Sequence, residues 1–430
     1  PVLHDQLDEW QSSFRPEFEG IRIVGYQWSP RSHEIKDFLS GNLMPYQWLD
    51  IESNETAQLL AGQNGIDHKE LPAVFFADGS FLKNPPLQAV GDKAGMKSQA
   101  SQTMYDVAII GAGPAGLAAA VYGGSEGLNT VLIEKRAPGG QAGTSSRIEN
   151  YLGFPKGLSG SELSQRAITQ AKRFGIEFLS PQEVRNVSFQ DNYKILELGD
   201  GSTINARSVI VTTGVDYRKH PAKGIDDFTG AGVYYGAATT EAHAVRDKEV
   251  YIVGGGNSAG QGAMYLSQFA KQVYIVIRKP DLSASMSQYL IDQIDSTDNI
   301  TLLACTNVLE VHGTDHLESI RMQDLNSGEE RTAEAAALFI FIGARPFTDW
   351  LQLDLIKDAK GFLETGNGLT RYDNFKKVWK LEREPFLLET CSPGVFAAGD
   401  VRAGAMNRVA SAVGEGSMAI KFVHAYLAEN

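Results

Sequence analysis

The sequence predicts an α/β protein with two Rossmann-like, three-layer dinucleotide-binding units, preceded by a smaller α/β unit. Two glycine clusters carry this prediction: Gly111–Gly116 reads GAGPAG, and Gly254–Ala259 reads GGGNSA. Each cluster directly follows a short apolar run and opens a segment rich in small residues. A glycine turn between a strand and a helix lets the backbone approach a pyrophosphate at the helix N-terminus. Two such turns predict two bound dinucleotides, which suggests a flavin and a nicotinamide.

Composition narrows the function classes. The 430 residues carry a net charge of −13, which argues against nucleic-acid binding because no basic stripe is available to release counterions. No apolar stretch is long enough to span a bilayer and no secretory signal is visible, so we expect a cytoplasmic location. The two cysteines form no C-x-x-C, so we expect neither a dithiol centre nor a metal site. Cys305 is predicted in a buried strand and Cys391 on a surface turn.

The first hundred residues form a separate α/β pattern. Strands are expected at Ile21–Tyr26 and Tyr46–Ile51, helices at Ser32–Leu39 and Glu55–Asn64, and a hairpin over residues 71–82. This order resembles the thioredoxin and glutaredoxin fold. Leu71–Val74 resembles the cis-proline segment of that family.

The active-site slot implied by this resemblance holds no cysteine. Trp28–Ser32 occupies the position of C-P-x-C, and Ser29 and Ser32 stand where both cysteines would be. A serine hydroxyl has no accessible thiolate, so the unit is expected not to cycle a disulfide. A simpler interpretation is that both serines cap the following helix. The polar stretch Asp92–Met104 is predicted to be a linker.

After the first fingerprint comes a second strand ending in an acid. Val131–Ile133 is followed by Glu134, about twenty residues beyond the glycines. An acid at this place accepts the ribose hydroxyls of an adenosine, and the alternative is a solvated strand end.

Later segments resemble the FAD-binding segments of bacterial thioredoxin reductases. They are Gly139–Gln141, Ile148–Pro155, Val211–Gly214, Val395–Arg402 and Arg408–Ala410. From Tyr105 onward the chain is therefore identified as a member of the thioredoxin reductase-like family, the class II pyridine nucleotide-disulfide oxidoreductases. The resemblance implies FAD, a homodimer, and Asp400 at the ribityl chain. The residues assigned to FAD are Gly111, Gly113, Pro114, Ala115, Gly116, Glu134, Lys135, Gly140, Gln141, Asn150, Thr213, Gly214, Gly399, Asp400, Arg408, Val409 and Ala410.

The second fingerprint is predicted to bind the nicotinamide nucleotide. The residues assigned to it are Gly254, Gly256, Asn257, Ser258, Ala259, Arg278 and Lys279. The last two end a predicted strand, where a basic pair accommodates a ribose 2′-phosphate and an acid would favour NADH. NADPH is therefore favoured over NADH, although a solvated strand end would look the same. The resemblance gives three units: residues 1–100, an FAD unit of residues 104–220 and 344–430, and an NAD(P)H unit of residues 221–343.

The redox dithiol of the family is missing. Thioredoxin reductases carry C-x-x-C-D before the nicotinamide fingerprint, whereas here Gly236 and Thr239 replace the cysteines and Thr240 the acid. No catalytic residue is assigned, and thioredoxin reductase activity is expected to be absent. Glu241 and His243 are nearby candidates for an acid or base, or else solvated helix residues.

Three functions stay open at this point. The favoured one is an FAD-dependent NAD(P)H oxidoreductase that passes electrons to ferredoxin, flavodoxin, a quinone or oxygen. The second is a non-catalytic, flavin-bearing redox sensor or docking protein. The third is a reductase to which another protein brings its own dithiol. Acceptor-dependent turnover separates the three.

Overall fold

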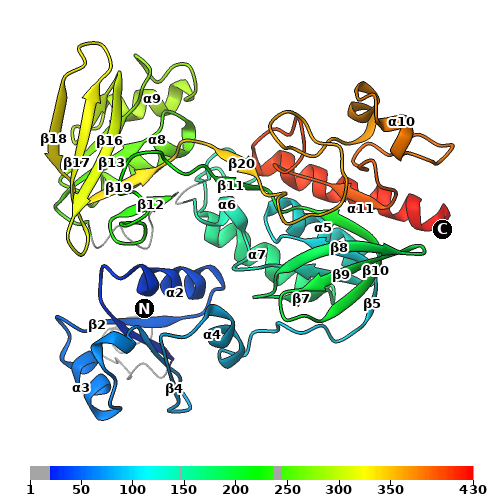
Figure 1. The fold of residues 1–430 in the computed structure, drawn as a ribbon, viewed down its shortest axis with the longest axis horizontal. Helices are drawn as coiled ribbons and strands as arrows, with labels where there is room; N and C mark the ends of the chain where they lie inside the picture. The colour runs from blue at the N-terminus through cyan, green and yellow to red at the C-terminus, as the bar shows by residue number, and fades with distance from the viewer. Residues whose placement is uncertain (1–19, 146–147, 236–244, 430) are drawn as a thin grey trace, which may run out of the picture.

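The structure is a computed structural model and describes residues 20–145, 148–235 and 245–429. The described chain forms three α/β units (Figure 1). The N-terminal unit contacts both of the others, which are called the FAD unit and the NAD(P)H unit after the assignment that the resemblance gives. A pair of short strands joins these two nucleotide units. No helix within the described ranges has the length and apolarity needed to cross a bilayer.

The N-terminal unit is a four-stranded sheet in the order β2-β1-β3-β4. Its strands are β1 (Ile21–Gly25), β2 (Tyr46–Asp50), β3 (Ala73–Phe75) and β4 (Phe81–Lys83), and its helices are α2 (Pro30–Gly41), α3 (Glu55–Gln63) and α4 (Leu87–Lys93), with a 3-10 turn at His68–Glu70. Strand β1 runs parallel to β2 and antiparallel to β3. The Leu71–Pro72 peptide is cis.

The two serines of the slot have different places. Ser29 is the N-cap of α2, and its Oγ accepts the N–H of Ser32 at 3.3 Å. Ser32 is instead fully buried inside the unit, and its Oγ has no hydrogen-bond partner among the described residues. The capping interpretation is therefore confirmed for Ser29 and wrong for Ser32.

The predicted linker is a packed segment. It overlaps the end of α4, and Ser98 is buried. The Nε2 of Gln182 donates to the Ser98 carbonyl at 2.9 Å. Polar composition alone does not reveal such packing, because backbone groups make the contact.

The FAD unit is built on a seven-stranded sheet in the order β7-β6-β5-β10-β9-β8, with β21 paired to β10. Its strands are β5 (Met104–Ile110), β6 (Thr130–Ile133), β7 (Glu177–Leu179), β8 (Val184–Gln190), β9 (Tyr193–Leu198), β10 (Thr203–Val211) and β21 (Val395–Ala397). Its helices are α5 (Pro114–Ser125), α6 (Gly140–Gly143), α7 (Gly160–Arg173), α10 (Phe375–Val378) and α11 (Val409–Glu429), with a 3-10 helix at Gly366–Arg371. Strands β5, β6, β7, β10 and β21 run parallel, and their apolar side chains form the core of this unit.

The NAD(P)H unit pairs a parallel sheet with a small antiparallel one. The parallel sheet has the order β12-β19-β13-β14-β15, from β12 (Val233–Tyr235), β13 (Glu249–Val253), β14 (Gln272–Val276), β15 (Ile300–Leu303) and β19 (Ala337–Ile340). The antiparallel sheet contains β16 (Thr306–Gly313), β17 (Leu317–Asp324) and β18 (Glu330–Glu334), and the helices are α8 (Asn257–Leu266) and α9 (Gln288–Asp295). Strands β11 (Val215–Tyr217) and β20 (Ala344–Pro346) pair antiparallel where the chain enters and leaves this unit.

Both cysteine predictions are wrong. Cys391 is buried, its Sγ accepts the N–H of Ile356 at 3.3 Å, and burial raises the pKa of its thiol. Cys305 lies in the turn between β15 and β16, partly exposed and with a φ of +49°. The segment around Ile356 packs on Cys391 itself, a contact that local sequence did not indicate.

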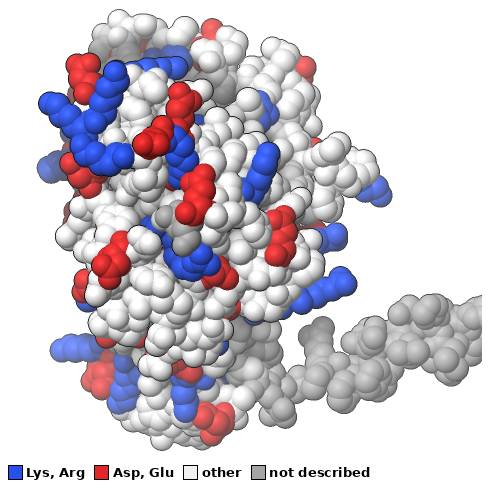
Figure 2. Space-filling view, turned by 90° about the vertical axis from the view of Figure 1, so that its right-hand side faces the viewer, with Lys and Arg blue, Asp and Glu red and all other residues white. Residues whose placement is uncertain are grey.

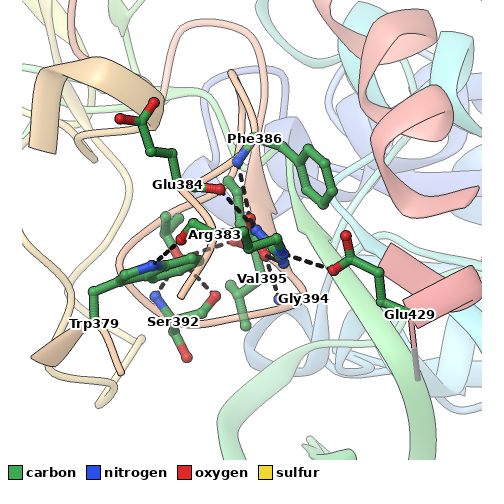
Figure 3. A network of polar contacts seen from close by, with 10 residues as sticks. Trp379, Arg383, Glu384, Phe386, Ser392, Gly394, Val395 and Glu429 are labelled. Carbon is green, nitrogen blue, oxygen red and sulfur yellow. Dashed lines mark hydrogen bonds and ion pairs between the residues drawn. The ribbon is translucent and has the colours of Figure 1, made fainter. Parts of the chain in front are cut away.

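A polar network ties the segment before β21 to the C-terminal helix (Figure 3). The Arg383 side chain bonds to Glu389 at 2.6 and 3.0 Å and to Glu429 of α11 at 2.6 Å. Glu389 is fully buried and also accepts the N–H groups of Phe386 and Gly394. This network fixes the approach of the chain to β21.

Charges are mixed on the outer surface of the FAD unit. Basic and acidic side chains are interspersed over the face shown in Figure 2. Such a surface favours solubility and produces no single-sign field.

Candidate functional site

One large cavity opens between the three units. Its volume is about 2500 Å³, and both glycine loops line it. A pocket for one small ligand commonly measures about 300–1000 Å³, so this cavity has room for two dinucleotides. The site is therefore common to the FAD unit and the NAD(P)H unit.

The first glycine loop connects β5 to α5 and leaves a bare backbone at the cavity. Gly111 has a φ of +104°, and a Cβ built on it would lie 2.7 Å from the Thr212 carbonyl oxygen. Gly113 is the N-cap of α5, and a Cβ there would meet nothing within 4 Å. The free N–H groups and the dipole of α5 therefore face open space, as a pyrophosphate requires.

The second glycine loop repeats this arrangement between β13 and α8. Gly254 has a φ of +145°, and a Cβ built on it would lie 2.5 Å from the Phe341 carbonyl oxygen. Gly256 is the N-cap of α8, and a Cβ there would have its nearest neighbour, the Ser285 carbonyl oxygen, at 3.9 Å. Each loop thus offers one helix N-terminus to the same cavity.

Glu134 lies at the end of β6 next to the first loop. One carboxylate oxygen accepts the Ala112 N–H at 2.9 Å, and the other accepts the Arg136 N–H at 3.0 Å. Burial raises the pKa of this carboxyl, and the two N–H groups oppose that effect. A carboxylate offers about four acceptor sites, so Glu134 shapes the loop and is still able to accept a ribose hydroxyl.

Two side chains fit FAD because they lack partners. The Oε1 of Gln141 is buried with no hydrogen-bond partner among the described residues, while its Nε2 donates to Val215 O at 3.3 Å. The Asp400 carboxylate lines the cavity, and no hydrogen bond to it occurs within the described part of the chain. Burial, and then the Glu415 charge, raises the pKa of Asp400 to about 6. Both groups fit acceptors for the hydroxyl and N–H donors of a flavin nucleotide.

Asp400→Asn is expected to stabilise the FAD-free protein at pH 8, by up to about 3 kcal/mol. The pKa of Asp400 is higher in the folded state than its unfolded value of 3.8. The contribution of Asp400 to stability is therefore fully present below pH 3.8 and is lost as the pH rises through about 6. Urea unfolding of FAD-free protein at pH 4.5 and 8 measures this, and the gain should shrink at the lower pH.

Asp200→Asn is a control in which the effect should have the opposite sign. Hydrogen bonds, first of all that from the Ser202 side chain, lower the pKa of Asp200, so its replacement should destabilise the protein at pH 8. FAD should bind about ten to a hundred times more weakly to Asp400→Asn, because an amide replaces a charged acceptor. Equal stability of Asp400→Asn and wild type at pH 8 would contradict the burial argument.

The predicted basic pair, Arg278 and Lys279, lines the part of the cavity that belongs to the NAD(P)H unit. Arg278 and Lys279 follow β14, are exposed, and line the cavity. In the described ranges neither takes part in an ion pair shorter than 4 Å. His220 lies close by, and burial followed by the Arg278 charge lowers its pKa. Its Nδ1 accepts the Ala222 N–H at 3.1 Å, which leaves the neutral ring protonated on Nε2.

Most of the residues predicted to bind a nucleotide line this one cavity. The exceptions are Gly116, Asn150 and Ala410. Gly116 packs α5 on the sheet, since a Cβ there would meet the Gly111 carbonyl, and Asn150 is exposed. Gly236, Thr239, Thr240, Glu241 and His243 lie outside the described residues. No group of three metal-ligating side chains occurs in the part of the chain that the structure describes.

The third wall of the cavity was not predicted from the sequence. One face of α2 lines it, with Pro30, His33, Glu34, Asp37 and Gly41 at helical spacing. No local signal marks α2 as a cavity wall, because the contact depends on how separate units dock.

Lys135 contacts the wall of the cavity in the FAD unit. Its Nζ lies 3.6 Å from the centroid of the Phe347 ring.

Comparisons with known proteins agree with this geometry. The family described as pyridine nucleotide-disulphide oxidoreductase matches residues 105–416. The thioredoxin reductase of Bacillus subtilis (strain 168) is 33% identical over 331 residues, covering 76% of this chain and 96% of its own.

Two solved structures are similar over about three quarters of the chain. Lactococcus lactis thioredoxin reductase in the FR conformation has a TM-score of 0.67 at 28% identity, covering 76% of this chain and all of its own. The T. acidophilum thioredoxin reductase has a TM-score of 0.67 at 29% identity, covering 75% and 99%. The match to the family begins after the N-terminal unit.

Proposed function

Because the chain belongs to the thioredoxin reductase-like family of pyridine nucleotide-disulphide oxidoreductases, we propose that it oxidises NADPH through FAD and delivers the electrons directly to an external acceptor. The family consists of flavin-dependent enzymes that use FAD and NADPH, and this chain is such an oxidoreductase. The proposal concerns the route of the electrons and the preference for NADPH over NADH.

The observation that carries the proposal is the common cavity. Both helix N-termini open into it, from α5 on one side and α8 on the other. When bound, FAD and NADPH supply the redox chemistry, a hydride transfer between two rings. The protein contributes alignment, since two nucleotides held in one cavity react as an intramolecular pair.

The absence of a dithiol from the sequence supports an external acceptor. Cys305 and Cys391 are the two cysteines of the chain, they are not bonded to each other, and neither lines the cavity. The acceptors we propose are ferredoxin, flavodoxin, a quinone, oxygen, or a dithiol of another protein. Thioredoxin reductase activity is not expected without such a partner.

We also propose that the N-terminal unit has a thioredoxin-like fold without redox function, which its mixed four-stranded sheet supports. The boundaries of the three units follow the sheets, with β11 and β20 at the junction. A homodimer is proposed from the family resemblance. A flavin-bearing sensor is the alternative, and the complete second glycine loop argues against it.

Anaerobic mixing with NADPH, and separately NADH, tests the proposal by following the absorbance of oxidised flavin. We expect NADPH to bleach the flavin within seconds. Gly256→Val should keep FAD but reduce it at least a hundredfold more slowly at equal NADPH, because the protein tolerates a Cβ there and the pyrophosphate does not.

Gly113→Val is the matched control at the other helix and should lose FAD instead. A panel of acceptors then identifies the oxidant. If neither nucleotide bleaches wild-type protein that retains FAD, the reductase proposal fails and the sensor alternative is favoured.

A further inference from the structure

The N-terminal unit contacts the NAD(P)H unit through its degenerate redox slot. Trp28 stacks on His316, in the turn between β16 and β17, with ring centroids 5.1 Å apart and planes at 16°. The Nζ of Lys248 lies 5.2 Å from the Trp28 ring centroid. His33 of α2 packs on Tyr234 of β12, with centroids 5.1 Å apart. These rings join the start of α2, and the residues just before it, to two separate elements of the NAD(P)H unit.

Backbones also meet at this contact. A Cβ built on Gly230 would lie 2.9 Å from the Cα of Pro30, and Gly230 has a φ of +84°. A glycine at this position lets the chain of the NAD(P)H unit pass directly against the slot. The place of a redox-active pair is thus used as a packing surface.

The other end of α2 contacts the FAD unit. The Nδ2 of Asn42, just beyond α2, donates to the Arg136 carbonyl at 2.7 Å, and Ser180 Oγ donates to Asn42 Oδ1 at 3.1 Å. The bond from Gln182 to the Ser98 carbonyl holds the end of the same unit. Contacts at or next to the two ends of α2 therefore reach both nucleotide units, and Figure 1 shows the place of α2 in the N-terminal unit.

The covalent connection between the nucleotide units is narrow by comparison. The chain crosses between them twice, and the crossings pair as β11 and β20, three residues each. A short strand pair is a soft joint, because few contacts oppose rotation about it. Further contacts that bridge both units consequently restrict their relative orientation.

We propose that the N-terminal unit is a latch that holds the FAD and NAD(P)H units in the orientation in which both glycine loops open into one cavity. Its contact residues are Trp28, Pro30 and His33 on one side and Asn42 on the other. The latch itself follows from the contacts. That the held orientation is the productive one rests on the proposed function.

The test measures orientation without requiring activity. Spin labels are placed on exposed positions of α7 and α9, through Lys172→Cys and Asp295→Cys in a Cys305→Ser background, in the full FAD-loaded chain. Pulsed electron resonance then gives the distance distribution between the two units. We expect one narrow distribution for the unmodified latch, and a broadened or second distribution for Trp28→Ala.

His316→Ala removes the same ring stack but lies in the NAD(P)H unit, so it leaves the N-terminal unit unchanged. If Trp28→Ala broadens the distribution only because the N-terminal unit misfolds, His316→Ala will not broaden it. Leu59→Ala, on the exposed face of α3, is the matched control and should keep the narrow distribution. An unchanged distribution in Trp28→Ala, His316→Ala and the double variant overturns the latch.

The rate of flavin reduction by NADPH is measured in the same variants. We expect at least a tenfold decrease in those whose distribution broadens, because the competent orientation then becomes a minor population. An unchanged rate with a broadened distribution overturns the claim that the held orientation is productive. If wild type shows no reduction at all, the proposed function fails while the distances still decide the latch.

Discussion

Replacing Glu389 with alanine is expected to lower the free energy of unfolding by about 3–5 kcal/mol. Glu389 is fully buried, and its two oxygens accept four hydrogen bonds, two from Arg383 and one each from the Phe386 and Gly394 N–H groups. Alanine leaves the guanidinium without its buried counter-charge and two N–H groups without acceptors. Removing one member of a buried pair costs far more than the pair itself contributes.

Glu429→Ala is the matched control, because Glu429 bonds to the same Arg383 at 2.6 Å but is 44% exposed. Solvent screens that pair, so its loss should cost less than about 1 kcal/mol. Chemical unfolding followed by circular dichroism at pH 7 measures both variants. Equal effects of the two substitutions would show that burial does not determine the strength of this network.

The same network bears on the cofactor site. Glu389 fixes Gly394, the residue before β21, and β21 leads directly to Gly399 and Asp400 at the cavity. Loosening this approach displaces Asp400 from its place. Glu389→Ala should therefore weaken FAD binding, although Glu389 does not line the cavity itself.

What the sequence predicted correctly is what local chemistry determines. Gly111 and Gly254 have positive φ values and close backbone neighbours, so the turn at each place requires glycine and the motif is readable. The strands before these glycines are continuous apolar runs, typical of parallel strands that are buried on both faces.

What the sequence did not predict depends on contacts between distant segments. Cys391 is covered by the chain around Ile356, and Ser32 is buried within its own unit. The role of α2 as a cavity wall arises from docking of separate units. None of these leaves a periodicity or spacing in the chain, because each arises from surfaces that meet only after folding.

Arg278→Ala is expected to raise the KM for NADPH about ten- to a hundredfold while the KM for NADH changes less than threefold. A charge-assisted hydrogen bond to a phosphate contributes about 1.5–3 kcal/mol. NADH lacks the 2′-phosphate and does not make this bond, so its binding should change little. Arg278 is exposed at the cavity, at the strand end where a basic residue would accommodate a 2′-phosphate. Its charge bears on His220, whose pKa it helps to lower, and it has no acidic partner within ion-pair distance in the described ranges.

Lys279→Ala is the comparison that separates a specific contact from general charge. The pKa of Asp281 is lowered first by hydrogen bonds from Ser283 and then by the charge of Lys279. The Asp281 carboxylate in turn compensates part of the Lys279 charge. We therefore expect a smaller effect from Lys279→Ala, less than about tenfold on NADPH. Steady-state KM values with both nucleotides measure the ranking. Equal losses for NADPH and NADH in Arg278→Ala would mean that Arg278 holds a part common to both nucleotides, and the preference for NADPH would then have no basis at this strand end.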